Sequence, residues 1–69
     1  MKNSAVLTAR EEKIMLLIKG GLINKDIATV IERSPDTVKY HLKNIYRKLG
    51  ASNRAEAINK FNGILNYKR

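Results

Sequence analysis

The segment from Ser34 to Gly50, SPDTVKYHLKNIYRKLG, constrains the fold more than any other part of this sequence. Serine followed by proline is typical of a helix start: the serine oxygen accepts a hydrogen bond from a first-turn amide, and proline lacks the N–H that would need a partner. Glycine readily ends a helix because it adopts the left-handed conformation without strain. We therefore predict a helix over residues 35–49.

This predicted helix has two unlike faces. At about 100° per residue, one narrow stripe is apolar and should face a core; it consists of Val38, Leu42, Ile45 and Leu49. The opposite arc is basic and polar, with Asp36 near its start, and holds Lys39, Tyr40, Lys43, Asn44 and Arg47. Any surface helix has a solvated charged face, but this one is nearly single-signed and lacks the mixed i, i+4 pairs of a merely soluble helix. The pattern favours a binding face.

Two further helices precede this segment. Thr8 and Glu11 have the spacing of a capping box, which predicts a first helix over residues 9–19 that Gly20-Gly21 ends. Its core stripe is Ile14, Leu17 and Ile18, and Leu16 falls outside that stripe. Asn24 is expected to cap a second helix over residues 25–32, with an inner face of Ile27, Ala28 and Ile31.

A fourth helix is predicted over residues 53–66, opened by the capping-box pair Asn53 and Glu56. Either Asn62-Gly63 breaks it or it continues towards Tyr67. No segment has the pattern of a strand, so the sequence predicts an all-α domain of four short helices. The expected organisation is a flexible N-terminal arm over residues 1–6 and a single domain over residues 7–69.

Composition limits how such a domain can be stabilised and what it can bind. The chain has no cysteine and one histidine, His41, so neither a disulfide nor a zinc site is expected, and no cofactor is predicted. A chain of 69 residues has little core, which makes dimerisation or a bound partner the usual additional support. No apolar run reaches the roughly 18 residues of a membrane span, so a soluble cytoplasmic protein is expected.

The charge is large and unevenly distributed. The formal net charge is +8, and residues 34–69 hold eight basic and two acidic residues against six and four in residues 1–33. Such a balance implies a polyanionic partner, either nucleic acid or an anionic membrane surface, that meets the second half of the chain. The turn of about three residues over 32–34 has helix-turn-helix spacing. Helix 35–49 is then expected in the major groove of double-stranded DNA.

The residues in this order resemble the LuxR/GerE-type helix-turn-helix family over about Leu7 to Ile58. The motifs are LTAREEKIM, GLINKDIA and SPDTVKYHLKNIYRKLGASNRAEAI, and the short chain resembles the stand-alone GerE type. Three residues depart from the family pattern: Ile23 replaces a serine or threonine, Arg33 replaces an apolar plug of the turn, and Lys13 replaces a frequent second glutamate. The stem of Arg33 is expected to cover the core while its head reaches solvent or phosphate.

The resemblance implies a transcription regulator that binds DNA as a homodimer through its fourth helix. By position, base reading is expected of Lys39, Tyr40 and Lys43, in agreement with the face derived from periodicity. Backbone contacts are expected of Asn24, Lys25, Ser34, Thr37 and Arg54, to which the helical wheel adds Asn44 and Arg47. The dimer interface is expected to contain Ala57, Phe61, Ile64 and Leu65.

Other function classes explain less of the sequence. The same fold could serve as a protein-interaction module that binds RNA polymerase or another regulator. Binding of single strands or RNA normally needs aromatic stacking platforms, and Tyr40 is the one aromatic residue on the basic face. An enzyme is not expected, because no nucleophile–base pair or glycine-rich phosphate loop is present. His41 is read as a packed structural residue, and membrane association is not expected.

Overall fold

The computed structural model of the chain describes residues 7–68, with side chains as far as residue 65. It contains four helices, α1 (Ala9–Lys19), α2 (Asn24–Ile31), α3 (Pro35–Leu49) and α4 (Arg54–Lys68), and no strand within the described range. The all-α prediction is confirmed, and the bounds of α1 and α3 agree with those expected from the sequence. The predicted arm over residues 1–6 lies outside the described residues.

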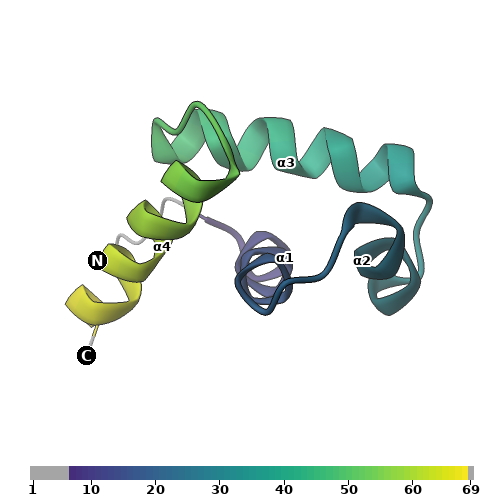
Figure 1. Ribbon diagram of the computed structural model, residues 1–69, viewed down its shortest axis with the longest axis horizontal. Helices are drawn as coiled ribbons and strands as arrows, with labels where there is room; N and C mark the ends of the chain where they lie inside the picture. Colours follow the sequence, from purple (N-terminus) through teal and green to yellow (C-terminus); the bar gives the residue numbers. More distant parts are fainter. Residues whose placement is uncertain (1–6, 69) are drawn as a thin grey trace.

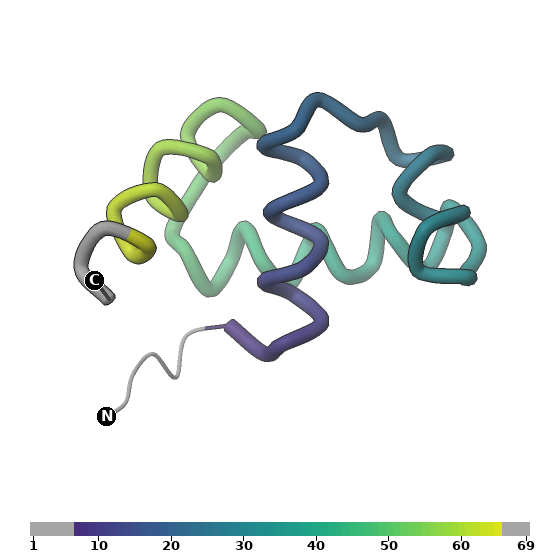
Figure 2. Tube along the Cα trace, turned by 90° about the horizontal axis from the view of Figure 1, so that it is seen from below, coloured from purple at the N-terminus to yellow at the C-terminus, as the bar shows by residue number. Residues whose placement is uncertain are grey.

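The other three helices gather on one side of α3. In Figure 1, α1 is seen end-on beneath the middle of α3, α2 lies beneath its N-terminal end, and α4 packs at its C-terminal end. Figure 2 shows the same arrangement from below, with α1 crossing in front of α3 and with α2 and α4 on opposite sides. Because all the packing is on this side, the opposite side of α3 stays open along the helix.

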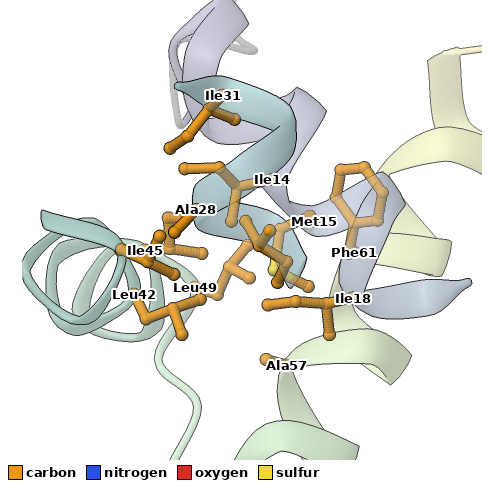
Figure 3. Close-up of a cluster of buried hydrophobic side chains, with 12 residues drawn as sticks. Ile14, Met15, Ile18, Ala28, Ile31, Leu42, Ile45, Leu49, Ala57 and Phe61 are labelled. Carbon is orange, nitrogen blue, oxygen red and sulfur yellow. The ribbon is translucent and has the colours of Figure 1, made fainter. Parts of the chain in front are cut away.

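All four helices contribute to one hydrophobic core (Figure 3). The apolar stripe of α3 is buried as predicted, and Ile14, Ile18 and Ile27 are buried from α1 and α2. Met15, which no sequence stripe indicated, is also fully buried, while Leu16 is 51% exposed as expected. Burying the large side chains of all four helices together is what gives so short a chain a fixed arrangement.

The helix ends of α1 and α3 follow their local sequence signals. The hydroxyl of Thr8 accepts a hydrogen bond from the Glu11 amide at 3.1 Å, and the Glu11 carboxylate accepts one from the Thr8 amide at 2.9 Å. Ser34 caps α3 by accepting from the Thr37 amide at 3.3 Å. Gly50 ends α3 in the left-handed region with φ 70. These three predictions are confirmed.

The predicted start of α2 is wrong by one residue. Ile23, in an extended conformation, occupies the N-cap position, and no side chain caps the helix. Asn24 is already helical, so it does not provide the expected cap. The helix ends at Ile31, and Glu32 follows in the left-handed region with φ 58. A residue with a Cβ is strained there, so α2 has an unfavourable residue at each end.

The start of α4 is capped nearly as predicted, but its end differs from the prediction. The side-chain oxygen of Asn53 accepts from the Glu56 amide at 2.9 Å, while the Glu56 carboxylate accepts from the amide of Ser52 instead of that of Asn53. The helix continues through Gly63 to Lys68, past the predicted end at residue 66. Glycine costs a helix about 1 kcal/mol relative to alanine, and core packing of Phe61, Ile64 and Leu65 around it opposes that cost.

None of the helices in the described part of the chain is both long and apolar enough to cross a membrane.

Candidate nucleic-acid interface

The open side of α3 carries the predicted basic face. Lys39, Tyr40, Lys43 and Arg47 are exposed, and Asn44 is half-buried. Tyr40 is 65% exposed, which is high for an aromatic ring in a domain with so little core to spare. The face is exposed because the apolar stripe one half-turn away is buried against the other helices. The structure therefore brings the three predicted base-reading side chains together on one surface.

The cations on this face differ in whether another side chain binds them. The Arg47 guanidinium donates to the Asn44 side-chain oxygen at 3.1 Å, one turn along the helix. Among the described residues neither Lys39 nor Lys43 has a hydrogen-bond or ion-pair partner. Tyr40 lies against His41, with ring centroids 5.9 Å apart. The two lysines consequently present uncompensated charge that an anionic partner can neutralise.

The connection between α2 and α3 has the expected helix-turn-helix length, residues 32–34. The Arg33 amide donates to the Ala28 carbonyl at 2.9 Å, which closes the end of α2. The Arg33 side chain is exposed and its guanidinium donates to the Glu32 carbonyl at 3.1 Å. Its head group thus lies at the surface as expected, and the turn contains no buried charge.

Small polar groups gather at the N-terminal ends of α2 and α3. Ser34 is exposed, Thr37 is half-buried, and their hydroxyl oxygens lie 3.2 Å apart. Lys25 is exposed and Asn24 half-buried at the start of α2. Hydroxyl and ammonium donors beside free helix amides are groups that bind phosphate oxygens. The predicted backbone-contacting residues of this region are therefore accessible.

Arg54 differs from the other predicted DNA-backbone contacts, because its side chain forms hydrogen bonds within the fold. Its guanidinium donates to the Leu22 carbonyl at 2.6 Å and to the Ile18 carbonyl at 3.4 Å. It thereby fastens the start of α4 to the end of α1 and to the loop that leads into α2. Local sequence patterns gave no sign of this contact, since the partners are 32 and 36 residues away.

Lys48, in the last turn of α3, is likewise bonded within the fold. Its ammonium donates to both Glu11 carboxylate oxygens, at 2.9 and 3.1 Å, and the Glu11 side chain is 8% exposed. Burial raises the pKa of Glu11, but hydrogen bonds from Lys48 and Thr8 together outweigh that effect and hold it below its ordinary value. This pair joins the first turn of α1 to the last turn of α3.

The predicted dimer residues divide into two groups. Ala57 and Phe61 have no exposed area because they belong to the core of their own chain. In this structure neither residue offers exposed area to a second copy. Ile64 and Leu65 are half-buried and pack on the edge of that core. The outer face of α4 instead presents the exposed residues Ala55, Asn59 and Gly63, with Ile58 half-buried beside them.

Within the described residues, no three histidine, cysteine, aspartate or glutamate side chains gather where they could hold a metal ion.

Comparison with known proteins agrees with the helix-turn-helix fold. The model of the family described as bacterial regulatory proteins, luxR family, matches residues 5–61. The chain is 52% identical over 52 residues to the probable transcriptional regulatory protein SgaR of Hyphomicrobium methylovorum, covering 75% of this chain and 25% of SgaR. It is 48% identical over 59 residues to the transcriptional activator protein VanR of Vibrio anguillarum, covering 86% of this chain and 25% of VanR.

A more distant relative is the HTH-type transcriptional regulator MalT of Yersinia pestis, 37% identical over 59 residues, which cover 86% of this chain and 6% of MalT. The chain thus spans a quarter or less of these relatives. No solved structure matches it significantly. Since the family match spans most of the chain, and since the four helices form the expected helix-turn-helix, the chain belongs to the luxR family of bacterial regulatory proteins.

Proposed function

We propose that this chain regulates transcription in the bacterial cytoplasm by binding double-stranded DNA in a sequence-specific way. The observation that carries the proposal is the open face of α3, where Lys39, Tyr40 and Lys43 are exposed and both lysines lack a partner among the described residues. The names of the relatives, which include a transcriptional activator, support the same function.

The shape of α3 suits the major groove. An α-helix with its side chains is about 10–12 Å across and the groove is about 12 Å wide. Lysine ammonium groups can donate to guanine O6 and N7, and a tyrosine ring can contact a thymine methyl group. The first two turns of a recognition helix reach deepest into the groove. These turns contain Lys39 and Tyr40, with Lys43 following them.

Phosphate contacts would hold α3 in register. Ser34 and Thr37 lie at the start of α3, Asn24 and Lys25 at the start of α2, and Arg47 with Asn44 further along α3. Arg54 is left out of this set because its guanidinium is bonded to the Leu22 carbonyl.

A selection of bound sites from random duplex DNA, followed by titration of the selected site, tests the proposal. Lys39→Ala and Lys43→Ala should each weaken binding by about 5- to 150-fold, the equivalent of about 1–3 kcal/mol per base contact. Lys13→Ala is the matched control, since Lys13 is exposed on α1, the helix beneath α3. If both α3 variants bind like the control, the proposed reading face is wrong.

The salt dependence separates DNA binding from the alternative of a protein-interaction module. Neutralising phosphates releases counterions, so log K should fall against log salt with a slope of about −0.9 per phosphate contacted. A flat salt response would instead favour binding to RNA polymerase or another regulator.

We further propose that two copies bind together through the outer face of α4. The small exposed residues Ala55 and Gly63 leave room for a second helix to approach, and Ile58 offers an apolar contact on the same side of α4. A Cβ added at Gly63 would meet nothing within 4 Å in its own chain. Gly63→Glu should therefore shift sedimentation towards the monomer and weaken binding to the selected site, while Gly63→Ala should not. Equal dimer fractions in both variants would exclude this face.

A further inference from the structure

We propose that Asp36 determines specificity within the DNA-binding face, by accepting a hydrogen bond from the N4 amine of a cytosine in the major groove. The inference rests on the proposed function and adds to it a base that the basic residues cannot select, because lysine ammonium groups donate and do not accept.

The position of Asp36 puts it among the base-reading residues. It is the second residue of α3 and is exposed. It precedes Tyr40 by four residues and Lys43 by seven, so the three lie along one stripe of the helix. The N-terminal end of a recognition helix lies closest to the base edges. The carboxylate is therefore carried into the groove together with the tyrosine.

The carboxylate is also unsatisfied by the protein. Among the described residues Asp36 has no hydrogen-bond or ion-pair partner, although Lys39 follows one turn later on the same helix. Glu11, by contrast, is bonded to Lys48 and Thr8. A solvent-exposed acceptor on a face whose lysines only donate can discriminate between bases, because base pairs differ in where they present hydrogen-bond donors.

The negative charge of Asp36 also favours contact with a base edge over contact with a phosphate. A phosphate in direct contact with the Asp36 carboxylate would be repelled, so this side chain itself favours a base edge that donates. Cytosine presents N4–H as its major-groove donor, whereas guanine presents the acceptors O6 and N7 and thymine the acceptor O4. Adenine presents both a donor at N6 and an acceptor at N7. A carboxylate can accept from N6 but cannot donate to N7.

A simpler role is that an acid in the first turn stabilises the helix through its dipole. Asp26 can stabilise α2 in the same way, since it is exposed in the first turn of that helix. It does not lie on α3. Asp26→Ala is therefore the matched control: it removes a first-turn carboxylate and should leave base preference unchanged.

Selection from random duplex DNA with the wild type, Asp36→Ala, Asp36→Asn and the Asp26→Ala control tests the inference, with thermal unfolding confirming that each is folded. The wild type should require cytosine at one position, where other bases weaken binding by about 5- to 150-fold. Asp36→Ala should lose preference at that position alone. Asp36→Asn should change it to adenine, which asparagine can bind at N6 and N7.

Three results would overturn the inference. In the first, Asp36→Ala selects the same sites as the wild type and changes the melting temperature alone, as a helix-stabilising residue would. In the second, the Asp36-dependent position prefers a base other than cytosine. In the third, Asp26→Ala alters the selected sites in the same way. Failure of the proposed function gives a different result, in which the wild type itself selects no sequence.

Discussion

The pair between Glu11 and Lys48 should be the most important single polar contact for stability. It joins residues 37 positions apart, and the Glu11 carboxylate also accepts from the Thr8 amide as part of the α1 cap. Glu11→Gln removes the charge but keeps an oxygen for Thr8. Glu11→Ala removes both interactions. Comparing the two variants therefore separates the ion pair from the cap.

The expected magnitudes follow from the environment of each group. A hydrogen bond to a charged group contributes about 1.5–3 kcal/mol. The lower end applies here because the Lys48 side chain is 32% exposed and can turn to solvent when its partner is lost. We expect Glu11→Gln to cost about 1.5 kcal/mol, and Glu11→Ala about 1 kcal/mol more through loss of the hydrogen bond that the Thr8 amide donates to the carboxylate. At about 4–8 °C per kcal/mol, the melting temperature should fall by about 6–12 °C and 10–20 °C.

Urea unfolding followed by circular dichroism at 222 nm measures these costs. The matched control is Asp26→Asn, since Asp26 occupies the third position of α2 as Glu11 does in α1, but is exposed. It should cost less than about 1 kcal/mol, the usual effect of an acid at a helix start. Lys48→Met should be far less harmful in a Glu11→Gln background than alone. Additive effects of the two changes would refute the ion pair as a source of stability.

The dependence on pH gives an independent check. The pKa of Glu11 in the folded chain lies below its ordinary value of 4.5. The folded state therefore binds the proton less tightly than the unfolded state does. The contribution of Glu11 to stability is present above pH 4.5 and is lost as the pH falls through the folded pKa. The stability gap between the wild type and Glu11→Gln should narrow with acidification, and a constant gap would contradict the assigned shift.

Four other substitutions test local features. Ile23→Ser should stabilise the chain by about 0.5–1 kcal/mol by capping α2, and an unchanged urea midpoint would show that the cap does not form. Glu32→Gly should gain about 0.5–1 kcal/mol by removing left-handed strain, whereas a loss would mean that the Glu32 side chain stabilises the turn. Arg54→Gln should destabilise the fold but leave the salt slope of DNA binding unchanged, while Arg47→Ala should reduce that slope by about 1; a reduced slope for Arg54→Gln would restore it as a phosphate contact.

The sequence predicted well whatever depends on neighbours within one helical turn. Thr8, Ser34 and Gly50 define helix ends because a cap is an interaction between residues close in sequence. The apolar stripe of α3 was evident from periodicity, and its opposite face followed from it. The same local logic failed at Asn24, because Ile23 takes the N-cap position without any side-chain hydrogen bond.

What only the tertiary structure decided concerns contacts between helices. Periodicity shows which residues of α4 share a face, but not whether that face packs on its own chain, and Phe61 is buried there. The sequence identifies Lys48 and Arg54 as cations, but it does not identify their partners. Glu11 binds Lys48, and the Leu22 carbonyl binds Arg54, from distant parts of the chain. The sequence by itself therefore determined the four helices and the basic face of α3. Packing determined that Lys48 and Arg54 are bonded within the fold, and a cation bonded in this way is not free to bind a partner.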